Sequence, residues 1–183
     1  GVGTWNTSAT FENVKVTDND SDKVLAEDDF SDSDSFKNNW QKVSDGNWSI
    51  KDGKLVQANA STNTSSYETT GTAAYFGDTS WTNYTYTVEA TKTGGEEGFL
   101  IPISVKNAKN NYFWNIGGWG NTLSCLQQVA DGGKSGQLSG TIKDCNIKTN
   151  TTYKLKVVVT DTNIKCYIDD ELYVDYDLPE TAT

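Results

Sequence analysis

The stretch YTYTVEAT at residues 84–91 alternates apolar and polar side chains along its whole length. One phase holds Tyr84, Tyr86, Val88 and Ala90, and the other holds three threonines and one glutamate. Because successive side chains of a strand point to opposite faces, this pattern predicts a strand with one buried face. Residues 153–159 and 164–168 repeat the alternation and are expected to form strands of the same kind.

Short turn sequences separate these strands. Residues 161–163 and Asp169-Asp170 are typical of tight hairpin turns. Residues 99–105 are almost continuously apolar, which predicts a central strand covered on both faces. Pro102 predicts a bulge in that strand, because proline cannot donate to the ladder. The other expected strands are residues 10–16, 23–27, 48–51, 54–58, 73–76, 112–117, 123–130, 137–143 and 172–176.

About twelve strands with no competing helical period predict an all-β domain of two packed antiparallel sheets, which we interpret as a jelly-roll sandwich. The length of 183 residues fits one such domain. We expect residues 1–18 to be a flanking strand that joins the sandwich, residues 19–178 to form the sandwich, and residues 179–183 to be a tail. The chain begins at Gly1 without Met or a signal peptide, which indicates a segment of a longer protein.

The charge of the chain excludes several classes of function. It has 15 basic residues, all lysine, against 25 acidic ones, for a net charge of −10. Nucleic acid and anionic membrane surfaces would be repelled by this charge. The lack of histidine excludes Ser-His-Asp and Cys-His catalysis and His-ligated metals. No run of about 18 apolar residues is present, so no segment is expected to span a membrane.

The acidic segment 18–38 has two interpretations. It can form solvated turns around a short strand, or its carboxylates can bind a structural Ca²⁺. Asp18, Asp20 and Asp22 have the 1-3-5 spacing of a calcium loop. Lys23 stands where the loop needs glycine and Asp29 where it needs glutamate, so the segment is not an EF-hand.

The three cysteines also leave alternatives open. Cys125 and Cys145 lie on either side of an expected turn at 131–136, and their numbers sum to 270, near the roughly 267 expected for facing residues of such a hairpin. A cross-strand disulfide and two reduced buried thiols are both compatible with this spacing. Cys166 shares its phase with Ile164 and Ile168 and is expected in the core.

Residues 94–121 combine aromatic rings, side-chain amides and carboxylates around a Gly117-Gly118 turn. The C–H faces of a sugar can lie on an aromatic ring, and its hydroxyls need planar donors and acceptors. We therefore predict a carbohydrate site made of Glu97, Tyr112, Trp114, Asn115, Trp119 and Asn121. Any single tryptophan here has an alternative interpretation as a core residue, and Trp40, Trp48 and Trp81 are expected in the core.

Carboxylate spacing argues against catalysis by this segment. Glycoside hydrolysis needs two carboxylates that face each other across a cleft. Glu96 and Glu97 are adjacent on an extended segment, so they point to opposite faces. We therefore expect a binding site without catalytic residues.

Several stretches resemble one family. YFGDTSWTNYTYTVEATKTGGEEGFLI (75–101) and NYFWNIGGWGNT (111–122) resemble the carbohydrate-binding-module-like sandwich of bacterial family 51 α-L-arabinofuranosidases. Residues 45–57, 164–176 and 3–16 look like its remaining strands. The resemblance implies a concanavalin- or laminin-G-like sandwich that is not catalytic itself and positions a linked glycosidase on plant cell-wall polysaccharide.

The leading hypothesis is therefore a secreted, monomeric module that binds a neutral plant polysaccharide, with xylan or arabinoxylan first and arabinan next. A polyuronate would be repelled by the charge of −10. Two alternatives are a small sandwich glycosidase or lyase, and a structural or adhesion module that binds a protein partner. No nucleic-acid or membrane partner is expected.

Overall fold

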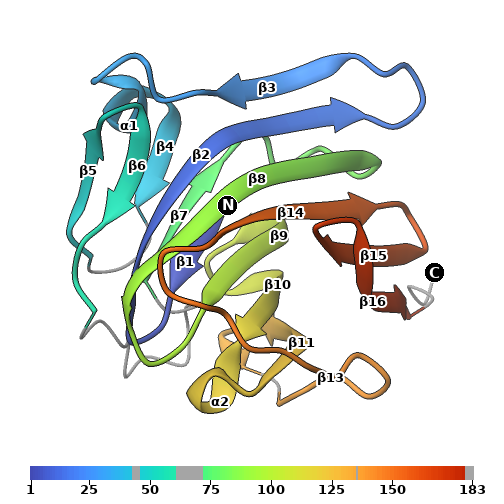
Figure 1. The fold of residues 1–183 in the computed structure, drawn as a ribbon. Coiled ribbons are helices and arrows are strands. Elements are labelled where there is room, and N and C mark those ends of the chain that lie inside the picture. Colours follow the sequence, from blue (N-terminus) through green and yellow to red (C-terminus); the bar gives the residue numbers. More distant parts are fainter. Residues whose placement is uncertain (43–45, 61–71, 135, 180–183) are drawn as a thin grey trace.

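Strands of the predicted kind pair into two antiparallel sheets that pack face to face (Figure 1). The structure is a computed structural model that describes residues 1–42, 46–60, 72–134 and 136–179. The prediction of an all-β, two-sheet sandwich is confirmed. Only two short helical segments interrupt the strands of this described part, α1 (Ser35–Asn39) and α2 (Gly118–Asn121), and neither is long enough to cross a bilayer.

The first sheet, called sheet A, contains eight strands. They are β1 (Val2–Thr4), β4 (Trp40–Lys42), β7 (Thr72–Phe76), β9 (Phe99–Asn107), β10 (Asn110–Gly117), β11 (Leu123–Ala130), β12 (Gly133–Lys134) and β13 (Lys143–Asp144). Their order across the sheet is β12-β11-β10-β9-β1-β7-β4, and β13 also pairs with β11.

The second sheet, called sheet B, also has eight strands. They are β2 (Thr7–Asp18), β3 (Val24–Asp28), β5 (Trp48–Lys51), β6 (Lys54–Gln57), β8 (Tyr84–Gly95), β14 (Thr152–Val159), β15 (Asn163–Ile168) and β16 (Glu171–Asp177). Their order is β16-β15-β14-β8-β2-β6-β5. β3 pairs with the C-terminal half of β2, on the same side as β6. Residues 1–18 thus supply an inner strand to each sheet rather than a strand at its flank.

The core lies between the sheets and is formed by the apolar phase of each strand. Tyr84, Tyr86, Val88 and Ala90 of β8 are all buried, as their alternation predicted. β9 is covered on both faces, as expected: Phe99 and Ile101 belong to the main core, while Leu100 packs with Phe113 and Val129 on the other face of sheet A. The predicted hairpin turn at Asp169-Asp170 is confirmed, with positive φ at both residues.

Two local expectations are wrong, for identifiable reasons. The bulge expected at Pro102 lies instead near Ser104, which has φ 49° and whose N–H donates to the Tyr84 hydroxyl at 2.9 Å. Residues 137–142 do not form a strand, and only Lys143 of the expected range belongs to one, the two-residue β13. The Thr141 hydroxyl accepts from the N–H of Leu126 at 3.0 Å, so a side chain takes the place of a strand partner there.

Candidate functional site

A cleft of about 430 Å³ opens between the sheets at one end of the sandwich. It is lined where β4 and β7 meet β9 and the start of β8. Its aromatic lining consists of Trp40, Tyr75, Phe76, Trp81, Tyr84 and Tyr86. This volume lies in the range of pockets that bind small ligands.

Trp40 forms a fixed wall of the cleft. Its ring stacks on Phe76 with 4.7 Å between centroids and 20° between planes. The indole Nε1 donates to Asp28 Oδ2 at 2.9 Å, and Asp28 Oδ1 accepts from the N–H of Phe30 at 2.8 Å. Because the indole N–H is already satisfied, Trp40 offers only apolar surface to a ligand.

Trp81 is the more accessible indole of the cleft and is held by the turn that precedes it. It packs directly over Gly77, where a Cβ would come within 2.4 Å of the ring at a φ of 102°. The carboxylate of Asp78 accepts from the N–H of Ser80 at 2.8 Å. Hydrogen bonding from Ser80, through its side chain and backbone, keeps the pKa of Asp78 below its usual value, so this exposed carboxylate is ionised.

The floor of the cleft is uncharged. The Tyr84 hydroxyl accepts from the N–H of Ser104, and the Tyr86 hydroxyl donates to the Gly1 carbonyl at 3.1 Å. Burial raises the pKa of both phenols, so they stay protonated at neutral pH. Around this floor the rim presents exposed amides from Asn38, Asn39, Gln41 and Asn107.

Few charges line the cleft. Among the side chains of the described residues that line it, Asp78 is the one carboxylate and Lys106 the one cation. The paired carboxylates that glycoside hydrolysis needs are therefore not brought together there. Apolar ring faces with neutral planar amides at the edge can instead bind a ligand that has both C–H faces and hydroxyls.

The predicted sugar-binding residues spread along β10 and the turn after it, from Tyr112 opposite Ile103 of the cleft to Asn121 at the other end of the sandwich, and β10 divides them between two faces. Tyr112 and Trp114 point between the sheets, whereas Asn115 lies on the opposite face. Trp114 is fully buried, and its Nε1 donates to Ser124 Oγ at 2.7 Å. The prediction that Trp114 is a ring platform is wrong, because the inward phase of β10 places it in the core.

Three more of the predicted residues have structural partners. The Tyr112 ring is half-buried, 6.4 Å from the Tyr176 ring. Asn115 is buried, and its Nδ2 donates to Gln127 Oε1 at 3.1 Å. Asn121 binds the backbone of Ile147 through both amide atoms, at 2.7 and 2.9 Å. These side chains hold the sandwich together and do not converge with the others on one surface.

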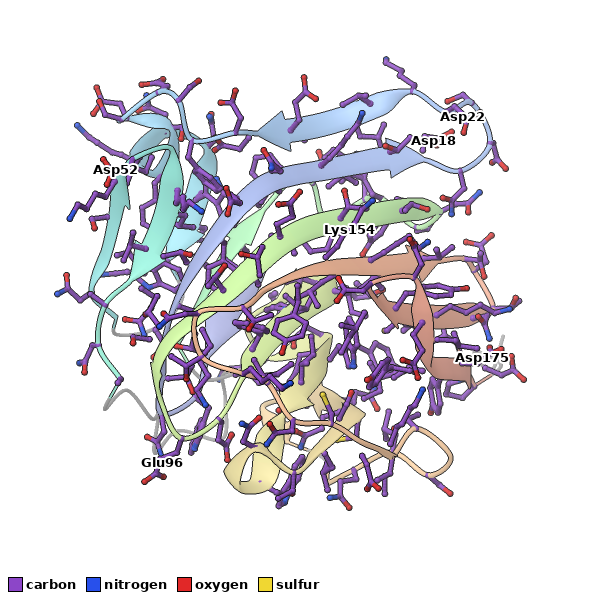
Figure 2. All side chains as sticks on the ribbon, in the orientation of Figure 1. Asp18, Asp22, Asp52, Glu96, Lys154 and Asp175 are labelled. Carbon is purple, nitrogen blue, oxygen red and sulfur yellow. The ribbon has the colours of Figure 1, made fainter. Side chains whose placement is uncertain are left out.

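Glu97 and Trp119 are the two predicted residues that do come together. Trp119 is 44% exposed, the largest aromatic surface among the exposed hydrophobic residues of the described chain. Glu97 Oε1 accepts from the N–H of Gly120, the residue after Trp119, at 3.2 Å. In Figure 2 the neighbouring Glu96 marks this end of the molecule, at its lower edge.

The cleft was not predicted from the sequence, because Trp40 and Trp81, which line it, were both expected in the core. That assignment is confirmed for Trp40, which is 8% exposed, whereas Trp48 and Trp81 only pack against the core with part of their surface. One signal was available: the turn-forming GDTS at 77–80 directly precedes Trp81, so this ring does not belong to the alternating pattern of a strand with one buried face.

Of the two interpretations of the acidic segment, the loop at Asp18, Asp20 and Asp22 favours solvated turns over a calcium site. Asp18 Oδ1 accepts hydrogen bonds from the N–H groups of Asp20 and Ser21 and from the Ser21 hydroxyl, and bonding to Ser21 lowers its pKa. Within the described ranges no group of three or more Asp, Glu, Cys or His side chains is placed to hold a metal ion. The Asp18 carboxylate closes a turn, at the upper right of Figure 2.

Of the two alternatives for Cys125 and Cys145, the structure shows the reduced thiols: all three cysteines are free and buried. The observed register pairs Leu123 with Asp144 and Ser124 with Lys143. Cys145 therefore lies opposite Thr122, whose carbonyl accepts its N–H at 3.0 Å, three positions from Cys125. Cys145 points into the main core, whereas Cys125 shares the outer face of sheet A with Asn115.

Comparison with known proteins relates this geometry to a carbohydrate-binding fold. An extracellular exo-α-L-arabinofuranosidase of Streptomyces chartreusis is 39% identical over 171 residues, which are 93% of this chain and 19% of that enzyme. The carbohydrate-binding module CBM66 of Bacillus subtilis matches with a TM-score of 0.55 and 23% identity, over 76% of this chain and 79% of that one. The expected resemblance is confirmed.

The chain thus corresponds to a module-sized part of an arabinofuranosidase, about a fifth of the relative's length. The structural match at 23% identity shows the shared fold, a β-sandwich of the carbohydrate-binding-module type. No protein-family model matches the chain.

Proposed function

We propose that this chain is a non-catalytic carbohydrate-binding module that binds a neutral plant polysaccharide through the cleft between the two sheets. The observation that carries this proposal is the composition of the cleft, which joins the rings of Trp81 and Phe76 to the exposed amides of Asn39 and Gln41. A sugar ring places its C–H face on an indole and directs its hydroxyls to amides that both donate and accept.

The ligand we favour is arabinoxylan or xylan, followed by arabinan. The relative from Streptomyces is by name an arabinofuranosidase, so arabinose-bearing polysaccharides are the natural candidates. A neutral polymer also suits the charge of the chain, because a net charge of −10 repels polyuronates. The affinity should be micromolar to millimolar, because water competes for exposed hydroxyls.

The proposed role is to hold a covalently linked glycoside hydrolase against its insoluble substrate. The chain covers 19% of an extracellular enzyme, which supports a secreted module attached to a larger catalytic protein. The single carboxylate of the cleft supports binding without hydrolysis. We expect the module to act as a monomer.

The test is affinity electrophoresis of the chain in native gels that contain arabinoxylan, xylan or arabinan. Trp81→Ala should weaken retardation about tenfold, the effect of losing roughly 60 Å² of apolar contact at about 25 cal/mol per Å². Gln41→Ala, at an exposed rim position, should weaken it about threefold without touching the core. Tyr167→Ala is the matched aromatic control, on the outer face of sheet B beside Lys156, and should migrate like the parent.

The result that overturns the proposal is unchanged retardation of both Trp81→Ala and Gln41→Ala on every polysaccharide that retards the parent. Absence of retardation of the parent on the whole panel would favour a module that binds a protein partner. Release of reducing sugar by the isolated chain would favour a small glycosidase or lyase.

A further inference from the structure

We infer that the turn at Trp119 is a second carbohydrate contact, separate from the cleft, so that the module binds polysaccharide at both ends of the sandwich. This inference rests on the proposed function and adds a second site to it. Its ligand is the same class of neutral polysaccharide, bound by stacking on Trp119 next to Glu97.

The backbone around Trp119 forms a left-handed turn. Gly117, Trp119, Gly120 and Asn121 all have positive φ, between 51° and 69°. Glycine adopts this conformation readily, but a bulky residue such as tryptophan does so at a cost of roughly 1–2 kcal/mol. Strained backbone persists only where its surroundings determine it, and such sites are often functional.

Two other segments, Glu97 and residues 146–147, hold this turn in place. Glu97 accepts the N–H of Gly120, both amide atoms of Asn121 bind Ile147, and Asn146 Nδ2 donates to the Asn121 carbonyl at 2.9 Å. Within the turn, the Thr122 hydroxyl donates to the Trp119 carbonyl at 2.9 Å. The structure thus fixes a strained backbone and leaves the indole that it carries open to solvent.

Lys92 adds an unusual cation to this end. It continues the inward phase of β8 after Ala90, pairs with Ala9 of β2, and is 4% exposed. Among the described residues its ammonium makes no hydrogen bond or ion pair, although it lies close enough to Glu97 for their charges to attract. Burial nevertheless lowers the pKa of this ammonium, as expected for a cation short of partners. Because it is buried, Lys92 does not contact the ligand itself but attracts the Glu97 carboxylate beside the turn.

The two sites lie at opposite ends of the same strands. The cleft is lined by residues near the start of β8 and the end of β9, whereas Glu97 connects the end of β8 to the start of β9. Phe99 and Asn107 are eight steps apart along β9, which is about 26 Å at the usual rise. A short oligosaccharide cannot reach both sites, but a long polysaccharide or two neighbouring chains can, which raises avidity.

The test is an NMR titration of the ¹⁵N-labelled chain with xylan- and arabinan-derived oligosaccharides. The chemical shifts of the backbone and indole N–H groups report which residues contact the ligand. The parent should show two independent sets of shifts, one at the cleft and one at residues 117–122. Trp81→Ala should retain only the second set. Trp119→Gly should retain only the first set and lose threefold to tenfold in affinity for the whole polysaccharide.

Trp119→Gly also controls for folding, because glycine accepts the left-handed conformation and the melting temperature should not fall. Lys92→Met keeps the buried stem of the side chain but removes the charge that attracts Glu97, so it should weaken the second set of shifts alone.

Shifts confined to the cleft, with unchanged polysaccharide affinity of Trp119→Gly, would overturn the second site and leave the proposed function standing. Shifts confined to the turn would overturn both the cleft and the two-site arrangement. No shifts at either end would overturn the proposed function as well.

Discussion

The two ends of the sandwich are built in different ways. The cleft end joins residues that are far apart in the sequence, such as Trp40, Trp81 and Ser104, and its shape depends on which strands lie side by side. The turn end is built mainly by six consecutive residues, 117–122, with anchors from Glu97 and residues 146–147. In Figure 1 this turn, α2, projects beyond the strands of sheet A.

Because the two ends are built differently, amino-acid substitutions at each end should have different effects on binding and on stability. The rings of the cleft are supported by a core that many strands share, so substitution of one rim residue should alter binding more than folding. The turn depends on a few hydrogen bonds and on glycines with positive φ. Local substitutions there should therefore alter both its conformation and the position of Trp119.

The largest effect is expected from Trp114→Ala, which tests the boundary between core and turn. Trp114 is fully buried, so its removal leaves a cavity and orphans the hydroxyl of Ser124. We expect a loss of about 3–5 kcal/mol in the free energy of unfolding, measured by urea denaturation. Trp119→Ala, five residues away and exposed, should change it by less than about 0.5 kcal/mol. Equal losses for the two variants would contradict this division.

An intermediate effect is expected from glycine substitutions with positive φ. Gly117→Ala would bring a Cβ within 2.6 Å of Asn121 Oδ1, which is held by Ile147. We expect it to cost about 2–4 kcal/mol, from conformational strain and lost hydrogen bonds. Gly120→Ala meets no atom within 4 Å and should cost only about 1 kcal/mol.

Gly53→Ala is the matched control for these glycines. Gly53 has φ 71° and open space around it, in the hairpin between β5 and β6. It should cost about as much stability as Gly120→Ala and leave polysaccharide binding unchanged. Thermal melts and affinity electrophoresis on the same three proteins separate strain from binding. A Gly117→Ala variant as stable as Gly53→Ala would show that the turn is not rigid.

The sequence predicted the sheets better than the sites because alternation is a local signal that reports one buried face. It identified β8, β14 and β15, but β1 and β4 are three residues long and show no period. The cleft was not predictable, because it depends on the order of β4, β7, β9 and β8 in two sheets. Trp114 lies in the inward phase of β10 and is buried, whereas Trp119 lies on the turn after β10 and is exposed, and the length of β10 decides between the two.

The smallest effect is expected from reductant, which tests the state of the thiols next to the turn. Burial raises the pKa of Cys125 to about 12 and that of Cys145 to about 11, from 9.0. The fold therefore favours the neutral thiols, and this contribution to stability is complete below pH 9 and is lost as pH rises through 11 and 12. Between pH 6 and 8 the melting temperature should be the same with and without dithiothreitol. DTNB should count three thiols after denaturation and almost none in the folded chain. A melting temperature that falls on reduction would show that Cys125 and Cys145 do form a disulfide. That bond would require the strand that carries Cys145 to shift by three positions from its register opposite Thr122.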